Sequence, residues 1–303
     1  MVVVRFFSPK LIQFQEPKAF DQRVRQWLTF REAENSYFFS QLVELTSGHY
    51  LENVRMFTID DGMSILLAGM LFSNGTLCTT WGTKELVEII ANQAEKENWQ
   101  ISNVFSPGHF SWLLGTELAK RTGRHAEANR AERAFQITRC SFELPPHGHL
   151  EVATERDKTL VRDWVEGFVE EAAYENKNVD AIVHALITSR LLYLWKCPEP
   201  VAMAAWVAPT PNGGSINFVY TPPELRGQGY GKAVSAALAE QMLASGLRYC
   251  FVLTDIKDAR TNSLYQAIGG ISVAEFLRCS LVAPPMTSAG LASGSTAHGR
   301  IGR

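Results

Sequence analysis

The segment that decides the fold is SINFVYTPPELRGQGYGK, residues 215–232 of the chain. Its apolar beginning predicts a strand over 215–220, which ends because the Pro-Pro pair that follows has no backbone N–H groups to donate. A glycine-rich turn comes next, over 226–231, and apolar residues at every fourth position then predict a helix over 231–244. The order strand, turn, helix therefore places a helix N-terminus directly behind a glycine-rich turn.

This arrangement predicts an anion-binding site. Gly227, Gly229 and Gly231 let successive backbone N–H groups turn toward one point, because glycine tolerates backbone angles that other residues avoid. The helix N-terminus adds about half a positive charge. Arg226 and Lys232 lie at the two ends of the turn and would add further positive charge there.

The spacing disfavours two kinds of nucleotide site. A dinucleotide-binding fold needs Gly-x-Gly-x-x-Gly and an acidic residue at the end of a strand about 20 residues later, and neither is present here. A P-loop needs Ser or Thr after Gly-Lys, but Ala233 follows Gly231 and Lys232. The anion is therefore expected to belong to another class of ligand.

The segment resembles the pyrophosphate loop of the GNAT superfamily of acyl-CoA-dependent N-acyltransferases. That loop follows Gln/Arg-x-x-Gly-x-Gly/Ala, which Arg226, Gly229 and Gly231 match. The apolar strand expected over 249–254 and the stretch NSLYQAIG, residues 262–269, are similar to the second motif of the superfamily. The resemblance covers roughly residues 150–282. It implies an α/β fold of two tandem mixed-sheet domains, with the coenzyme site in the second.

The resemblance also implies a role for each matching position. The backbone of residues 218–221 would pair with the pantetheine arm of acetyl-CoA as an added strand, and N–H groups of residues 228–232 would hold the pyrophosphate. Asn262 would bind the coenzyme or cap a short helix. The expected cofactor-binding residues are Phe218, Val219, Tyr220, Thr221, Arg226, Gly227, Gln228, Gly229, Tyr230, Gly231, Lys232 and Asn262.

Tyr265 is the catalytic residue that the resemblance implies. The acceptor amine would attack the thioester carbonyl, which a backbone N–H of the 216–220 strand polarises, and Tyr265 would protonate the departing thiolate. Taken alone, the spacing of Tyr265 also fits a core tyrosine on an amphipathic helix. Asn217 stands where some enzymes of the superfamily carry a carboxylate, so the base is expected elsewhere or as a chain of waters.

Two positions depart from the superfamily pattern, and several others have ordinary structural explanations. Asp258 stands where asparagine is usual, and Gly270 where an aromatic residue is usual. Three carboxylates where the acceptor loop would lie fit solvated surface charges; they are Glu170, Glu171 and Glu175. Five aromatic residues fit the core as well as an acceptor cleft; they are Trp164, Phe168, Tyr193, Trp195 and Trp206.

The organisation along the chain predicts two domains. At 303 residues the chain has the length of about two domains of about 150 residues. Residues 145–149, in the Pro-Pro-His-Gly-His stretch, are expected to link residues 1–144 to residues 150–283. Residues 284–303, rich in Gly, Ser, Ala and Thr, are expected to form a disordered tail.

Both halves show a similar order of predicted elements, which suggests a duplication although no residue-level repeat is visible. Helices are expected over 20–30, 36–45, 84–97, 110–121, 158–173, 180–188, 231–244 and 262–268. Strands are expected over 54–59, 64–71, 76–80, near 104, 135–138, 191–196, 201–207, 215–220, 249–254 and 272–280. In the first half, the corresponding turn, residues 79–83, has one glycine only. The first half is therefore interpreted as a degenerate GNAT-like domain. Its expected role is either structural or to shape the acceptor site.

Composition narrows the function classes. A net charge of −2, from 29 basic and 31 acidic residues, argues against a nucleic-acid-binding protein. The apolar stretches are shorter than the roughly 20 residues that a membrane span needs. Five cysteines, none in a Cys-x-x-Cys pair, argue against a disulfide scaffold or a zinc ribbon and fit a reducing cytoplasm. No metal, membrane or nucleic-acid partner is expected, and a homodimer stays open.

The sequence favours an N-acetyltransferase that moves the acetyl group of acetyl-CoA to a primary amine of a small molecule or an exposed peptide by direct attack. Two alternatives stay open. One is a non-catalytic acyl-CoA-binding regulatory module, and the other is a transferase that uses a larger acyl or aminoacyl donor.

Overall fold

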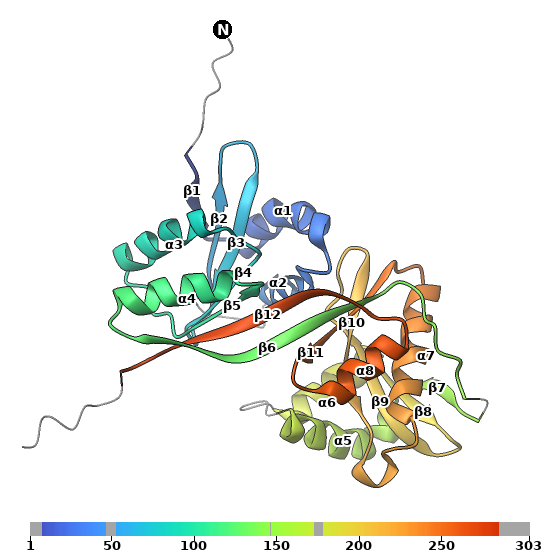
Figure 1. The fold of residues 1–303 in the computed structure, drawn as a ribbon. Helices are drawn as coiled ribbons and strands as arrows, with labels where there is room; N and C mark the ends of the chain where they lie inside the picture. Colours follow the sequence, from blue (N-terminus) through green and yellow to red (C-terminus); the bar gives the residue numbers. More distant parts are fainter. Residues whose placement is uncertain (1–7, 47–52, 146, 173–177, 285–303) are drawn as a thin grey trace, which may run out of the picture.

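The structure, a computed structural model, describes residues 8–46, 53–145, 147–172 and 178–284. Residues 285–303 of the expected tail, Pro146 of the expected linker and Glu175 lie outside the described residues. The described part forms an α/β structure with a twelve-stranded mixed sheet, so the predicted fold class is confirmed (Figure 1).

The two halves follow the same order of elements, as the sequence predicted. In the first half these are β1 (Lys10–Phe14), α1 (Pro17–Leu28), α2 (Ser36–Thr46), β2 (Arg55–Asp60), β3 (Ile65–Leu71), β4 (Thr76–Thr79), α3 (Lys84–Lys96), β5 (Asn103–Pro107), α4 (Phe110–Arg121) and β6 (His125–Ile137). In the second half they are β7 (His149–Val152), α5 (Lys158–Glu171), α6 (Val179–Thr188), β8 (Leu192–Lys196), β9 (Pro200–Val207), β10 (Gly213–Tyr220), α7 (Tyr230–Ala244), β11 (Tyr249–Asp255), α8 (Ala259–Ala267) and β12 (Ile271–Val282).

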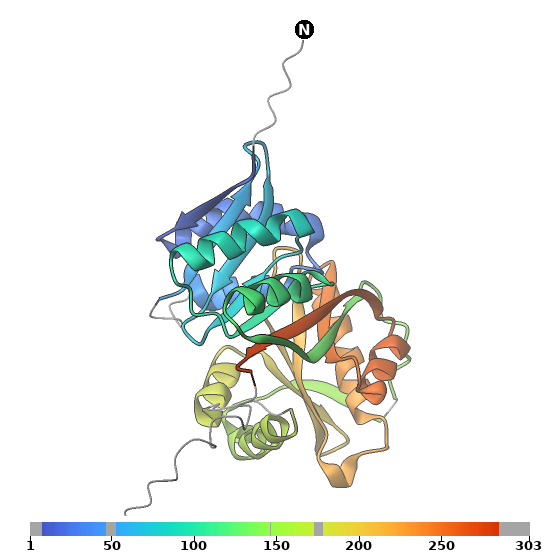
Figure 2. The ribbon, with the colours of Figure 1, turned by 60° about the vertical axis from the view of Figure 1, so that its left-hand side comes forward.

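The sheet is continuous across the two halves, because each half gives a strand to the other. The strand order is β1-β2-β3-β4-β5-β12-β6-β11-β10-β9-β8-β7, so β12 pairs with β5 of the first half and β6 pairs with β11 of the second. In Figure 2 these two strands run side by side between the two lobes. The division into domains of residues 1–144 and 150–283 stays a prediction. In the sheet, each range borrows one strand from the other: β12 lies beside β5, and β6 lies beside β11.

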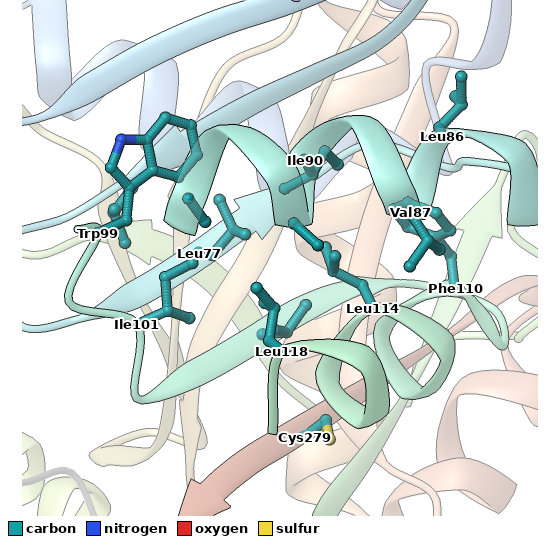
Figure 3. Packing of buried hydrophobic residues seen from close by; sticks show 14 of the residues in the cluster. Leu77, Leu86, Val87, Ile90, Trp99, Ile101, Phe110, Leu114, Leu118 and Cys279 are labelled. Carbon is teal, nitrogen blue, oxygen red and sulfur yellow. The ribbon is translucent and has the colours of Figure 1, made fainter. Parts of the chain in front are cut away.

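The buried side chains follow this exchange. The core under α3 and α4 includes Cys279 from β12, which lies beneath α4 in Figure 3. Gly115 of α4 makes room for it, since a Cβ at this glycine would lie 2.4 Å from Cys279 Sγ. Residues 271–282 therefore belong to the packing of the first half as much as to that of the second.

Helices cover both faces of the sheet. One face carries α3 and α4 over the first half and α7 and α8 over the second, and the other carries α1 and α2 and then α5 and α6. Side chains of β6 and β11 alternate between the two faces, as the period of a strand requires. Phe135 and Val252 lie in the core beneath α7 and α8, whereas Ala134 and Leu253 lie in the core beneath α1 and α2.

Candidate active site

The site begins where β10 and β11 part. These parallel strands pair over three residues only, and Ser215↔Phe251 is the last pair. Strand β10 continues to Tyr220 with β9 on its other edge, and among the described residues no strand pairs with its β11 side beyond Ser215. This edge of β10 is therefore open to an extended ligand that adds as a strand.

A bulge interrupts β10 at the same place. The register with β9 shifts between Asn217 and Tyr220, and Phe218 has a φ of +50°, which is uncommon for a residue other than glycine. The backbone N–H of Phe218 donates to Asn217 Oδ1 at 2.7 Å. The residues predicted to pair with pantetheine, 218–221, thus lie on the open edge, with the first amide already bonded to its neighbour.

The glycine-rich turn after β10 forms an unobstructed helix N-terminus. Gly227 and Gly229 have φ values of +81° and +84°, and a Cβ at either position would meet no atom within 4 Å. Gly229 is the N-cap of the 15-residue helix α7, and no side chain accepts a hydrogen bond from the first turn. The turn therefore directs unpaired backbone N–H groups and the positive end of the helix dipole into open space.

Arg226 closes the base of this turn. Its Nε donates to the backbone oxygen of Thr221 at 2.8 Å, and its Nη2 pairs with Glu171 Oε1 at 2.5 Å. The guanidinium carbon also lies 5.6 Å from the ring centre of Tyr220. The hydrogen bond that Arg226 donates to Glu171 raises the pKa of Arg226. Arg226 is therefore paired with Glu171 in this structure, and its contribution to the anion site stays a prediction.

Glu171 is exposed, as expected for a surface charge, but it also has a specific partner. It lies at the end of α5 and pairs with Arg226 at the start of the glycine-rich turn. Nothing in the local sequence indicates this pair, because 55 residues separate its two members. The other charged residue of the turn, Lys232, has its ammonium 5.3 Å from the ring centre of Phe142.

Tyr265 lies in the core between α8 and α7. It is 3% exposed, and its ring centre lies 6.2 Å from that of Phe135. Burial raises the pKa of Tyr265 to about 12, and the nearby Ser235 hydroxyl of α7 opposes the shift. Ser235 Oγ is itself buried without a hydrogen bond of ordinary geometry to any described residue. Tyr265 therefore keeps its proton through the physiological pH range, and its role as a general acid stays a prediction.

Asn262 is buried at the junction of β11 and α8. Its amide nitrogen donates to the backbone oxygens of Asp255 and Asp258 at 2.8 and 2.6 Å, and its oxygen accepts from Thr254 Oγ1 at 3.0 Å. Both amide protons are used internally, so Asn262 ties the end of β11 to the start of α8, and its contact with the coenzyme stays a prediction. The N-cap of α8 is Asp258, which accepts from the Thr261 N–H at 3.0 Å.

The described part of the first half, residues 8–46 and 53–145, lacks both parts of this site. Helix α3 begins six residues after Cys78, the last β4 residue paired with β5, whereas α7 begins fifteen residues after Ser215. The short connection packs tightly, since a Cβ at Gly82 would lie 2.7 Å from the ring of Phe110. The first turn of α3 also carries a carboxylate, Glu85, which would repel an anion.

The tyrosine is missing as well. Helix α4 follows β5 as α8 follows β11, but α4 contains no tyrosine. The first half therefore has the strand and helix arrangement without the turn or the hydroxyl.

Two further expectations concern metals and membranes. In the described ranges, no group of three or more His, Cys, Asp or Glu residues is arranged to hold a metal ion. None of the helices in these ranges combines the length and the apolar character that crossing a bilayer requires.

Comparisons with known proteins place this geometry in a family of folds. The family model of FR47-like proteins matches residues 194–279, from β8 to β12. None of the curated proteins compared with the chain matches it in sequence.

Solved structures resemble the chain over nearly its full length. A GNAT-family acetyltransferase from Colwellia psychrerythraea has a TM-score of 0.60 and 13% identity, with 90% of this chain and 99% of that chain covered. A GCN5-related N-acetyltransferase from Sphaerobacter thermophilus has a TM-score of 0.61 and 13% identity, with coverage of 91% and 97%. A tandem GNAT protein from the clavulanic acid biosynthesis pathway has a TM-score of 0.53 and 10% identity, with coverage of 92% and 100%.

These likenesses establish the fold. The predicted resemblance to the GNAT superfamily is confirmed for the arrangement of the whole described chain, and the family model supports it in the half that carries the glycine-rich turn. At 10–13% identity they do not establish a substrate.

Proposed function

We propose that this chain is an N-acetyltransferase that moves the acetyl group of acetyl-CoA to a primary amine. The observation that carries the proposal is the combination of an open β10 edge with an unobstructed, glycine-lined N-terminus of α7. A coenzyme with an extended amide arm and a pyrophosphate needs both features, side by side. A simple anion site needs only the second.

The reaction follows from this placement. The pantetheine arm lies along residues 218–221, and the pyrophosphate accepts hydrogen bonds from backbone N–H groups of residues 228–232. The nitrogen lone pair of the amine forms the new C–N bond at the thioester carbonyl, and the electron pair of the C–S bond leaves with sulfur. Tyr265 donates a proton to the thiolate, and the amine nitrogen loses its surplus proton to a base.

The raised pKa of Tyr265 changes the balance of the last proton transfer. A phenol with a pKa of about 12 is a weaker acid than the thiol that it would form, whose ordinary pKa is about 8.5. The transfer is favourable only if the thiolate is also desolvated, because burial raises both pKa values. The proposal therefore requires the sulfur to lie in the same water-poor region as Tyr265.

The test is a turnover assay on the full chain. Acetyl-CoA would be mixed with one amine at a time from a panel of spermidine, tyramine, glycine and the tripeptide Ala-Ala-Ala, and thiol release would be followed with a thiol reagent. Amine-dependent thiol release with at least one member is the expected result. Tight acetyl-CoA binding without thiol release would instead support a non-catalytic regulatory module.

A further inference from the structure

A buried serine of α7 has a hydroxyl whose hydrogen-bonding capacity is unused. Ser235 is 0% exposed, and its Oγ forms no hydrogen bond of ordinary geometry with any described residue. Buried polar atoms are nearly always hydrogen-bonded, because burial takes away their bonds to water. The hydroxyl of Ser235 therefore needs an explanation.

Ser235 also does without the usual partner of a helical serine. A serine or threonine within a helix commonly bonds to a backbone oxygen three or four residues earlier. Ser40 of α2 does so, with its Oγ 2.7 Å from the oxygen of Tyr37. Because Ser235 makes no such bond, its hydroxyl is available to a group on a neighbouring element.

The neighbouring element is α8. A Cβ at Gly231, one helical turn before Ser235, would lie 3.7 Å from Leu264 Cδ1. Residues four positions apart lie on the same side of a helix, so Ser235 faces α8 as well. Tyr265 follows Leu264 in α8 and belongs to the buried cluster beneath α7. The helix interface therefore brings the side chains of Ser235 and Tyr265 together.

The Ser235 hydroxyl lies close enough to that of Tyr265 to affect its proton. The pKa of Tyr265 is raised to about 12, mainly by burial and further by the charge of Asp258. Ser235 acts in the other direction and lowers this pKa, because a donor beside the phenol oxygen stabilises the charged phenolate. A hydrogen bond to a charged oxygen is stronger than one between neutral groups, so this donor has its largest effect on the phenolate.

We propose that Ser235 is a positioning residue for Tyr265 and donates a hydrogen bond to its phenolate as the thiolate is protonated. This assignment rests on the proposed function. The proton of Tyr265 moves to sulfur as the C–S bond breaks, and the phenol oxygen keeps the electron pair of its O–H bond. Ser235 keeps its own proton and directs it at the charged oxygen. The phenolate then regains a proton from solvent. An amine that enters as an ammonium ion loses two protons while sulfur gains one, so each turnover releases one proton.

The assignment addresses the unfavourable direction of this proton transfer. A buried phenolate lacks the water that would otherwise stabilise it, so a fixed donor beside it lowers the free energy of the state that forms as sulfur is protonated. Ser235 lies one turn beyond Gly231, so the helix whose N-terminus would hold the pyrophosphate also supplies this donor.

The experiment removes the serine hydroxyl in the presence and in the absence of the phenol. Ser235→Ala, Tyr265→Phe and the double variant would be compared with the wild-type chain in kcat with spermidine and tyramine, in Kd for acetyl-CoA and in melting temperature. Ser235→Ala should lower kcat by about 10-fold or more and leave Kd within about twofold, because the bond to a charged oxygen forms only during the reaction. In the Tyr265→Phe background, the same change should alter kcat by less than about twofold.

Ser111→Ala is the matched control. Ser111 of α4 is also 0% exposed, and its Oγ also lacks a partner in the described part of the chain, but it lies outside the candidate site. Each alanine removes a buried, unpaired hydroxyl, so both variants should melt at or above the wild-type temperature. Ser111→Ala should turn over as the wild type does.

Three results overturn the assignment alone. They are a kcat of Ser235→Ala within about threefold of wild type, an equal loss in the Tyr265→Phe background, and a melting temperature of Ser235→Ala well below that of Ser111→Ala. Wild-type turnover by Tyr265→Phe overturns the assignment together with the role of Tyr265. Failure of the wild-type chain to bind acetyl-CoA, or to acetylate either amine, overturns it together with the proposed function.

Discussion

Replacing Gly229 by glutamate tests the coenzyme turn at its most exposed point. Gly229 has a φ of +84° and caps α7, and a Cβ there would meet no atom within 4 Å. The glutamate side chain therefore fits without a clash, but its carboxylate occupies the space in front of the helix N-terminus. We expect the protein to fold and the site to be blocked.

The expected loss of folding stability is much smaller than the expected loss of acetyl-CoA affinity, so the two effects can be measured separately. A residue with a side chain in the left-handed region costs roughly 1–2 kcal/mol, and a carboxylate at a helix N-terminus returns roughly 0.3–1 kcal/mol. Stability should therefore fall by about 1 kcal/mol. A hydrogen bond to a charged group contributes about 1.5–3 kcal/mol, so losing two or three at the pyrophosphate weakens binding by about 5 kcal/mol, or more than 1,000-fold in Kd.

Gly123→Glu is the matched control. Gly123 also has a positive φ, +65°, with nothing within 4 Å of its Cβ position, but it follows α4 in the first half. Titration calorimetry with acetyl-CoA would be run on both variants beside thermal melting. Gly123→Glu should lose somewhat more stability, because its carboxylate lies at a helix C-terminus, and should bind normally. If Gly229→Glu binds within about threefold of wild type, the pyrophosphate does not lie at this turn, and the reasoning fails.

Three further predictions concern Tyr265 and the strand exchange. Tyr265→Phe should lower kcat by about 100-fold or more with an unchanged Kd for acetyl-CoA, measured by steady-state kinetics and calorimetry; turnover within about threefold of wild type would make Tyr265 structural. The folded state keeps the Tyr265 proton up to about pH 12, whereas an unfolded tyrosine loses it near pH 10, so the wild type should lose about 2–3 kcal/mol more stability than Tyr265→Phe as urea denaturation is moved from pH 9.5 to pH 12. Equal losses would contradict the burial of the hydroxyl. Residues 150–283 expressed alone should aggregate or stay unfolded by circular dichroism, because β11 then lacks its partner β6; a monomeric fragment that binds acetyl-CoA would contradict this expectation.

The helices and the coenzyme turn were predictable because their signals are local. The helix over 110–121 and the turn with Gly227 and Gly229 depend on residues a few positions apart, and the structure places both as expected. The short outer strands β1 and β7 were missed, since five and four residues carry too little alternation. Strand β6 was predicted only over its apolar end, 135–138, because its first residues are largely exposed.

The exchange of strands and the contacts across it could not be predicted in the same way. The pairing of β6 with β11 joins residues more than 100 positions apart. The apolar residues of β6 would fit equally well beside a strand of the first half, so the pattern does not identify the partner strand. The ion pair between Arg226 and Glu171 lies within the second half, but it joins residues 55 positions apart, so the local sequence does not indicate it either. The sequence identifies the residues whose side chains could bind or react, whereas the topology decides which of these side chains come into contact.

The stoichiometry of acetyl-CoA binding tests the central claim most directly. The second half has the open strand edge, the glycine-rich turn and Tyr265, while the first half has a short connection filled by Phe110 and no tyrosine in α4. Titration calorimetry of the full chain should therefore show one molecule of acetyl-CoA bound per chain. Two equivalent sites, or no binding, would contradict the account.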